Sequence, residues 1–203
     1  KASAGNSTVI TAGELEERLR KRLPYGIFPE NVALALTVCW EAGIDPEKAE
    51  AGIMNWIAGT KSPLTTIHAG GKNIRFLNAF SVNDVASTES FIGHWKEVAD
   101  HTGKISVILN TRADRPVRSD LFSEWIAKNP QSFDRIIVTG THRKRARHKL
   151  LRSGVAKEKV SCWNRKEMRD PVKSLVSSVE DGSFVAGAGN IGGDGFHIIN
   201  ELR

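Results

Sequence analysis

Residues 104–110 read KISVILN, and after a polar loop and a helical stretch residues 134–139 read DRIIVT. Both are short apolar runs rich in β-branched residues, a composition typical of buried strands. Outward from this pair, further apolar runs lie at 74–80, 159–163 and 183–186, and stretches with helical spacing lie near 85–101, 119–128, 143–153 and 171–180. Strands alternating with helices predict an α/β fold, a Rossmann-like, mostly parallel sheet with helices on both faces.

Residues 1–62 have helical rather than alternating patterning. Thr11 and Glu14 have the spacing of a capping box, which predicts a helix start there. A later helix, about 29–42, is apolar nearly all round over 32–40, so we expect it to be buried between other elements. Four tryptophans at helical spacing are expected to pack in cores: Trp40, Trp56, Trp95 and Trp125.

Residues 63–72 separate the helical part from the alternating part. They contain Pro63, Gly70 and Gly71, residues that interrupt regular structure, so we predict a linker there. The chain begins with Lys1 instead of Met, and we therefore expect a processed product or an excised piece of a longer protein.

The composition is that of a soluble globular protein, with 40% hydrophobic and 26% charged residues. Its longest apolar run, 32–40, is well short of the roughly 18–20 residues that cross a bilayer, and no signal peptide opens the chain. Cys39 and Cys162 stand far apart, which argues against a disulfide framework and a thiolate zinc site. We expect a soluble, intracellular protein with reduced thiols.

The net charge of +6 comes from one stretch. Overall, 29 Lys and Arg face 23 Asp and Glu, but the excess lies in 142–152, which holds six cations and no acid: Arg143, Lys144, Arg145, Arg147, Lys149 and Arg152. A basic helix of this kind favours a solvated or anion-facing surface, and nucleic-acid binding is the alternative.

Ligands of an open α/β sheet bind at the carboxyl ends of its strands, so the loops after the strands are the places to search. All five are polar: 78–84, 110–118, 140–142, 164–165 and 187–195.

The loop after the apolar run 104–110 holds Arg112, Arg115 and Arg118 within seven residues, together with Asp114. Arginine forks at this density favour recognition of a carboxylate or phosphate. The alternative is a solvated loop in which Asp114 forms an internal salt bridge. His142 follows the apolar run 134–139, and this position at a strand end makes it a candidate site residue.

Two other loops have candidate residues with simpler alternatives. Asn83 and Asp84 precede a helix, where Asp84 could be only its N-cap. Gly187, Gly189 and Gly192 fit G-x-G-x-x-G, but the residues after Gly192 are too few for a dinucleotide-binding unit. We expect a glycine loop that approaches an anion or a neighbouring domain, with a purely structural turn as the alternative.

A nucleotide phosphate loop is not found in the sequence. Residues 59–62, GTKS, resemble the end of a Walker A motif but lack its upstream glycine.

Four segments, taken in order, resemble the poly-γ-glutamate synthase ligase subunit (CapB-type), a branch of the Mur-ligase superfamily: 76–88, 109–118, 138–142 and 187–193. Residues 30–36 with Gly43 and Ile44 are similar to the end of the central, ATP-binding domain of those ligases. The resemblance implies a helical remnant of that central domain at 1–62, a linker at 63–72 and a Mur-ligase-like C-terminal α/β domain at 73–203.

In that family, ATP phosphorylates a carboxylate and the amine of the next amino acid attacks the acyl phosphate. The resemblance therefore implies an ATP-dependent amide ligase that polymerises glutamate through its γ-carboxyl, for a capsule or a secreted polymer. ATP and Mg would be bound mainly by the central domain, whose P-loop this chain lacks, so the chain alone is expected to be inactive.

The resemblance also implies partners and a location. The partners are the P-loop-bearing half of the ligase, glutamate and the growing poly-γ-glutamate, and membrane-bound synthase subunits; a homo-oligomer is possible, and nucleic acid is not expected. The implied location is the cytoplasm, where partner subunits would associate the chain with the membrane. The other functions considered are a stand-alone module that binds anions or carboxylates without catalysis, and a nucleic-acid-binding protein that uses the basic helix 142–152.

The resemblance assigns roles to the candidate residues without naming a catalytic residue or a metal ligand. Substrate binding falls to Arg112, Asp114, Arg115, Arg118 and His142. The loop that faces the nucleotide and the amine contains Asn78, Asn83 and Asp84. The loop for an anion or a domain contact contains Gly187, Gly189, Asn190 and Gly192. Asn78 and Ser81 stand where the general Mur pattern has an acid and a histidine, and Ser81, Val82 and Val85 replace expected small residues and a proline.

Overall fold

The computed structural model describes residues 12–202, so the predicted cap at Thr11 lies outside the described residues. The chain divides into two compact units, Lys1–Lys61 and Ser62–Arg203. Each unit has its own hydrophobic core.

Within residues 12–61, the described part of the first unit, lie three helices: α1 (Ala12–Arg20), α2 (Pro29–Glu41) and α3 (Pro46–Ala58). Asp45 caps α3 by accepting a hydrogen bond from the main-chain N–H of Lys48 at 3.0 Å. The buried apolar residues of this unit are Leu15, Leu19, Val32, Ala33, Leu36, Ala49 and Ile57.

The prediction that α2 is buried all round is wrong for this chain. Leu34 and Val38 are 65% and 60% exposed, because α1 and α3 cover only one side of α2. The prediction that Trp56 packs in a core is also wrong, since its side chain is 67% exposed. This unit therefore leaves a substantial part of its apolar surface uncovered by its own three helices.

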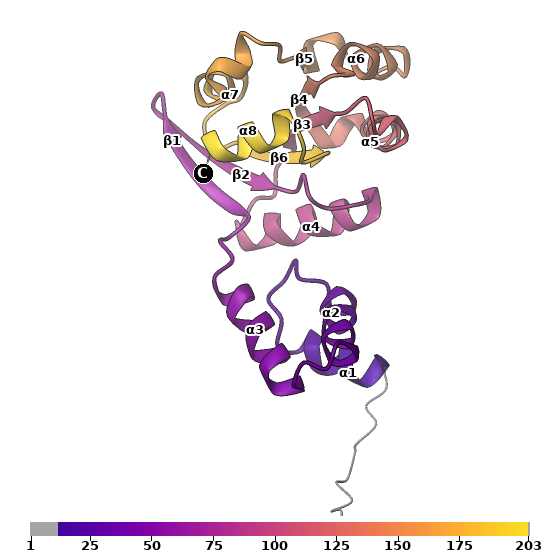
Figure 1. Ribbon diagram of the computed structural model, residues 1–203. Helices are drawn as coiled ribbons and strands as arrows, with labels where there is room; N and C mark the ends of the chain where they lie inside the picture. Colours follow the sequence, from indigo (N-terminus) through magenta and orange to yellow (C-terminus); the bar gives the residue numbers. More distant parts are fainter. Residues whose placement is uncertain (1–11, 203) are drawn as a thin grey trace, which may run out of the picture. The chain divides into compact units, whose positions relative to one another are not determined.

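The second unit is built on a six-stranded sheet with the order β1-β2-β6-β3-β4-β5 (Figure 1). The strands are β1 (Leu64–Ala69), β2 (Lys72–Asn78), β3 (Ile105–Thr111), β4 (Phe133–Gly140), β5 (Val160–Cys162) and β6 (Phe184–Gly189). Only the β1–β2 pair is antiparallel; the other neighbouring strands of the sheet are parallel. The predicted α/β fold with a mostly parallel sheet is confirmed.

The prediction of a linker at 63–72 is wrong, because these residues form β1 and its turn into β2. Gly70 and Gly71 are the two turn residues, with φ of 58° and 74°. A two-residue hairpin turn of this kind requires positive φ at both positions, which glycine adopts without steric cost. The glycine pair therefore marks a hairpin and not a domain boundary.

Helices cover both faces of the sheet. They are α4 (Val85–Val98), α5 (Pro116–Lys128), α6 (Arg143–Arg152), α7 (Pro171–Ser178) and α8 (Asp194–Glu201), with short 3-10 turns η1 (Pro130–Ser132), η2 (Lys157–Lys159) and η3 (Glu167–Arg169). One apolar cluster joins the sheet to α4, α5 and α6, and a second joins its other face to α7 and α8. The helix α8 has no counterpart among the sequence-predicted elements.

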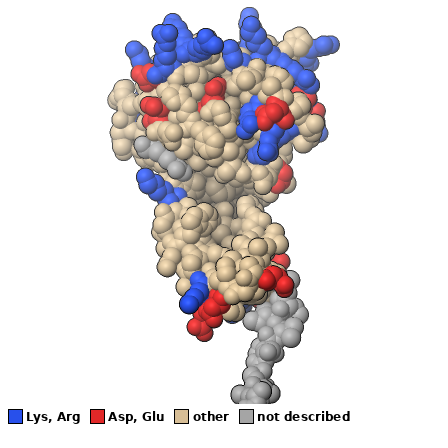
Figure 2. Space-filling model, viewed as in Figure 1, with Lys and Arg blue, Asp and Glu red and all other residues tan. Residues whose placement is uncertain are grey.

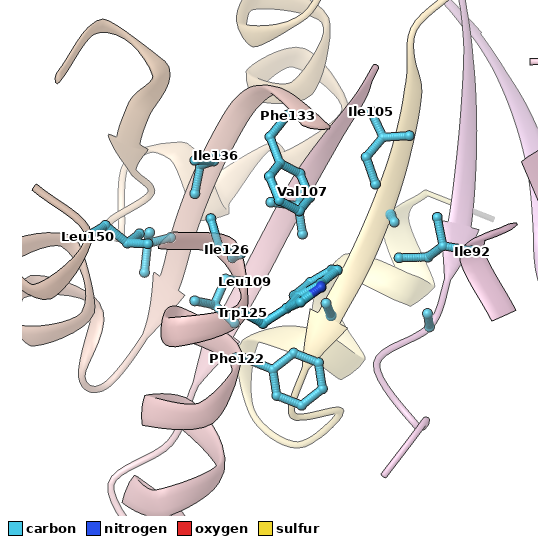
Figure 3. Close-up of a cluster of buried hydrophobic side chains, with 14 of the residues drawn as sticks. Ile92, Ile105, Val107, Leu109, Phe122, Trp125, Ile126, Phe133, Ile136 and Leu150 are labelled. Carbon is cyan, nitrogen blue, oxygen red and sulfur yellow. The ribbon is translucent and has the colours of Figure 1, made fainter. Parts of the chain in front are cut away.

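Strand β3 lies in the middle of the sheet, and all of its residues are buried. Val107 and Leu109 face the α4–α6 side, and Ile108 faces the α7–α8 side. On the α5 side, Trp125 meets Phe133 edge to face, with ring centroids 5.2 Å apart (Figure 3). Close packing on both faces fixes the strand ends from which the functional loops leave.

Candidate functional site

A pocket of about 590 Å³ lies at the carboxyl ends of β3, β4 and β5, next to the loop that follows β6. This is the edge at which open α/β sheets bind ligands. Its lining residues are Asn110, Thr111, Arg112, Ala113, Asp114, Gly140, Thr141, Arg143, Trp163, Asn164, Arg165, Met168, Gly192, Gly193 and Asp194.

The floor of the pocket is fixed by Asn110, the fully buried side chain near the end of β3. Its Nδ2 donates hydrogen bonds to the main-chain carbonyls of Asn190 at 2.6 Å and Gly192 at 2.9 Å. The main-chain N–H of Asn190 donates in return to the carbonyl of Asn110 at 3.1 Å. These bonds tie the glycine loop after β6 to the neighbouring strand.

Asp194 joins the first residue of α8 to the end of β4. Its Oδ2 accepts hydrogen bonds from Thr139 Oγ1 at 2.5 Å and from the main-chain N–H of Gly140 at 2.9 Å. This oxygen is thus committed to holding the loops around the pocket, and the other carboxylate oxygen has no hydrogen bond to the described residues.

Arg112 is engaged on two sides. Its Nε and Nη2 donate to Asp114 Oδ1 and Oδ2 at 2.9 Å and 2.6 Å, and these bonds lower the pKa of the Asp114 carboxyl from its ordinary value. Its Nη1 lies against Gly192, where a Cβ atom would collide with it. The internal Asp114 salt bridge, the simpler of the two interpretations of this loop, is therefore present, with Arg112 still at the pocket wall.

Three arginines line the pocket: Arg112 from the loop after β3, Arg143 from the first turn of α6, and Arg165 from the segment after β5. Arg143 Nη1 donates to the carbonyl of Gly140 at 3.1 Å, and the exposed Arg165 side chain makes no hydrogen bond to the described residues. The two acids in the lining are Asp114, which is paired with Arg112, and Asp194, which is bonded to Thr139 and Gly140 through one oxygen. With three arginines and two aspartates in its lining, the pocket has an excess of positive charge, which favours an anionic ligand. Guanidinium groups suit a carboxylate or phosphoryl group.

Arg118 and the loop after β2 form a separate group outside this pocket. Arg118 donates to the carbonyl of Val82 at 2.5 Å and to Asn83 Oδ1 at 3.4 Å, and its guanidinium lies 5.8 Å from the centre of the Phe122 ring. Burial and the charge of Arg115 lower the pKa of Arg118, while Asp84 acts in the opposite direction. Arg118 therefore positions the loop rather than facing the pocket.

Asp84 caps α4, as the simpler interpretation predicts. Its carboxylate accepts from the main-chain N–H of Ser87 at 2.8 Å and from Ser87 Oγ at 2.7 Å, and these bonds lower its pKa. Asp84 does not line the pocket.

Other predicted site residues also lie outside the pocket lining: Asn78, Arg115, His142, Gly187, Gly189 and Asn190. Asn78 ends β2 with a buried Oδ1 that has no hydrogen-bond partner among the described residues. Gly187 lies under the Phe80 ring, and Gly189, with φ of 93°, packs against the carbonyl of Asn110. These two glycines serve packing, whereas Gly192 reaches the pocket.

Asn110, Arg165 and Asp194 were not singled out from the sequence, and Arg143 was predicted only as part of the basic stretch 142–152. The positions of Asn110 and Arg165 directly after strands were a usable signal. The pairing of Asp194 with β4 depends on α8, which the sequence pattern did not predict, so no signal for it was at hand.

Residues 12–202 show neither of two further features, a cluster of metal ligands and a membrane-spanning helix. No three His, Cys, Asp or Glu side chains gather there as metal ligands. None of the helices in this range combines the length and hydropathy that crossing a bilayer requires.

Comparison with known proteins identifies relatives of this architecture. The chain is 30% identical over 147 residues to the PGA synthase CapB of Bacillus subtilis (strain 168), covering 70% of this chain and 37% of that protein. It is 33% identical over 129 residues to the Capsule biosynthesis protein CapB of Bacillus anthracis, covering 60% and 27%. The chain thus spans roughly a third of the length of these relatives.

A solved structure of UDP-N-acetylmuramoylalanyl-D-glutamyl-2,6-diaminopimelate--D-alanyl-D-alanyl ligase from Acinetobacter baumannii aligns with a TM-score of 0.41 and 15% identity, covering 85% of this chain and 34% of that one. Residues 64–203 match the family described as the Poly-gamma-glutamate synthase CapB C-terminal domain. The match begins at the first residue of β1 and includes every element of the α/β unit. The resemblance noted in the sequence is confirmed, and the chain belongs to the family of CapB C-terminal domains.

Proposed function

We propose that this chain is the C-terminal part of an ATP-dependent amide ligase that polymerises glutamate through its γ-carboxyl by way of an acyl phosphate. The observation that carries the proposal is the pocket at the carboxyl edge of the sheet, where Arg112, Arg143 and Arg165 converge. Membership of the CapB C-terminal family supports the choice of glutamate, a dicarboxylate, as the ligand.

In this proposal the arginines hold an anion while the amide bond forms. Arg143 and Arg165 orient the α-carboxylate of the incoming glutamate and so present its amine. Arg112 lines the same pocket, and its Nη1, which lies against Gly192, stabilises charge on a phosphoryl oxygen. Asn110 and Asp194 act indirectly, because their hydrogen bonds keep the glycine loop and the end of β4 in place.

ATP, when bound, supplies the phosphoryl group that activates the γ-carboxyl for attack by the amine. The three arginines fit an anionic group of this kind, while no metal ligand is assigned to this chain. We infer that a P-loop-bearing half holds ATP and Mg, and that the chain works in the cytoplasm with membrane-bound synthase subunits. A homo-oligomer fits the same scheme.

The test is glutamate-dependent ADP formation from Mg-ATP, measured for this chain alone, for a separately produced P-loop-bearing half alone, and for the two together. Activity only in the mixture is expected. Arg112→Ala in this chain should reduce it by at least about tenfold, since one charge-stabilising contact is worth more than about 1.4 kcal/mol in a site of this kind.

Arg152→Ala is the matched control, because Arg152 is an exposed arginine at the end of α6 away from the pocket. Its activity should remain within twofold of the unchanged chain. No ADP formation in a mixture shown to associate would contradict the proposal. Binding of glutamate by this chain without any activity would favour the stand-alone anion-binding module instead.

A further inference from the structure

Helix α6 carries positive charges on two sides, and only the side that packs against α5 has acidic partners. On the side that packs against α5, Arg145 Nη2 lies 2.7 Å from Asp120 Oδ2, and Lys149 Nζ lies 2.7 Å from Glu124 Oε1. The Lys149 ammonium also lowers the pKa of the Glu124 carboxyl. The acids of α5 thus neutralise this side of the helix.

The other side of α6 and the segment between β5 and α7 carry cations without such partners. We call this set the basic strip: Arg143, Lys144 and Arg147 on α6, and Arg165, Lys166 and Arg169 after β5. None of the six forms a salt bridge within residues 12–202. Figure 2 shows Lys and Arg side chains gathered along this edge of the α/β unit.

The two acids within the same segment are already used. Glu167 Oε2 accepts from the main-chain N–H of Asn164 at 2.9 Å, and Asp170 caps α7 by accepting from the N–H of Lys173 at 2.9 Å. Neither carboxylate forms a salt bridge with a cation of the strip, and the six cations outnumber these two acids. Lys144, Arg165, Lys166 and Arg169 are exposed and Arg143 and Arg147 are half-buried, so the excess positive charge is accessible from solvent.

The strip is continuous with the pocket. Arg143 and Arg165 belong to both, and Arg147 follows Arg143 by one helical turn, about 6 Å along the axis. Cys162 Sγ at the end of β5 lies 3.9 Å from the main-chain carbonyl of Arg143, so the start of α6 lies beside the end of β5. A ligand leaving the pocket on this side would meet one cation after another.

We infer that the basic strip binds the growing γ-linked polyglutamate chain, holding its free α-carboxylates outside the pocket while its end lies at the reacting site. The inference rests on the proposed function. A γ-linked polymer carries one carboxylate per residue, so it matches a row of cations longer than a single glutamate can occupy. Exposed guanidinium and ammonium groups bind such a chain by charge and allow it to slide, since each contact is weak.

Nucleic acid is the competing polyanion, and the strip lacks a feature that nucleic acid favours. Proteins that bind single strands stack the bases on exposed aromatic rings. The Trp, Tyr and Phe residues between 143 and 169 are limited to Trp163, which is 2% exposed. Charge without stacking fits a carboxylate polymer better.

The test compares binding of a fluorescent γ-linked polyglutamate by the full chain and two triple variants. The strip variant is Lys144→Gln, Arg147→Gln, Lys166→Gln, which leaves every pocket-lining residue unchanged. The control variant is Lys104→Gln, Arg152→Gln, Lys157→Gln, which removes the same charge from exposed cations at the amino edge of the sheet. Circular dichroism and thermal unfolding establish that both variants are folded.

The strip variant should bind the polymer about tenfold more weakly than the control variant, because exposed ion pairs are individually weak but three are lost together. Binding should weaken as salt rises from about 50 to 200 mM, and free glutamate at equal carboxylate concentration should compete poorly. Equal binding by both variants, or no binding by the unchanged chain, would overturn the inference. Tighter binding of single-stranded RNA than of the polymer at the same salt would also overturn it.

Binding requires neither ATP nor catalysis, so this result is separate from that of the ADP assay. A chain that binds the polymer through the strip but forms no ADP in the mixture refutes only the ligase proposal. A mixture that forms ADP with a chain that does not bind the polymer refutes only the assignment of the strip.

Discussion

Asn110 and Asn190, eighty positions apart in the sequence, hold each other through reciprocal hydrogen bonds. Asn110 Nδ2 donates to the carbonyl of Asn190 at 2.6 Å, and Asn190 donates to the carbonyl of Asn110 through its N–H at 3.1 Å and its Nδ2 at 3.3 Å. Both side chains are buried, so the bonds are sheltered from water. The shape of the glycine loop thus depends on its bonds to β3 as well as on its own glycines.

Asn110→Ala should lower the free energy of unfolding by about 2–4 kcal/mol, because it leaves the buried carbonyls of Asn190 and Gly192 without their donor. Chemical denaturation measures this change. The control is Asn129→Ala, which removes one bond from Nδ2 to the carbonyl of Trp125 at 3.0 Å and should cost about 1 kcal/mol. Equal costs for the two variants would contradict a special role of Asn110 at the pocket floor.

Gly192→Ala should displace the Arg112 guanidinium, since a Cβ atom at this position would overlap Nη1. We expect ADP formation in the two-part mixture to fall by about tenfold, the cost of misplacing one charged contact. Gly93→Ala is the control, because its Cβ would meet open space on α4 and should stabilise the helix by about 1 kcal/mol. Unchanged activity in folded Gly192→Ala would show that the contact is dispensable.

Asp114→Asn should weaken the interaction with Arg112, because a bidentate ion pair with two hydrogen bonds is replaced by a hydrogen bond to a neutral amide. If Arg112 binds an anion of the substrate, the KM for glutamate or ATP should fall by about two- to fivefold, since an exposed ion pair is worth only about 1 kcal/mol. Steady-state kinetics of the mixture measures this. A rise in KM would indicate that Asp114 orients Arg112 instead of competing for it.

Asp84→Ala should cost about 1 kcal/mol of stability at pH 7, because Asp84 caps α4. Its pKa is lower in the folded chain, mainly through the hydrogen bonds from Ser87, so the ionised form stabilises the fold. This contribution is fully present above the unfolded pKa, near 4, and is lost as the pH falls through the folded value.

The difference between Asp84→Ala and the unchanged chain should therefore shrink below about pH 4 in chemical denaturation at several pH values. Asp134→Ala is the control, since Asp134 is exposed and accepts no side-chain hydrogen bond from the described residues. It should change stability by less than about 0.5 kcal/mol at pH 7. A difference for Asp84→Ala that stays constant down to acid pH would refute the role of its charge.

The strands and most helices of the α/β unit could be predicted because their signals are local. The apolar run at 104–110 became β3, whose burial on both faces matches its lack of polar alternation. The boundary at 63–72 was misjudged because Gly70 and Gly71 serve a hairpin as readily as a linker. The burial of 32–40 was overestimated, since an apolar sequence does not say whether a covering surface lies within the same unit.

The candidate site was predicted in its position and only partly in its members. Arg112, Asp114 and Gly192 do meet at the pocket, whereas Arg118 and Asp84 are used by the loop after β2 and by α4. Which polar residue of a loop faces a ligand and which caps a helix depends on side-chain direction. Residue type alone does not give that direction.

The sequence by itself determined the α/β class, the edge of the sheet at which the loops gather, and the family. Hydrophobic periodicity and the order of motifs are local properties that can be read directly from the sequence. Only the tertiary structure decided that Asn110 anchors the glycine loop, that Arg143 and Arg165 join Arg112, and that α5 neutralises one side of α6. These relations join residues distant in sequence. The first arises because β6 pairs with β3 out of chain order, and the other two arise because β3, β4 and β5 lie side by side with their helices on one face.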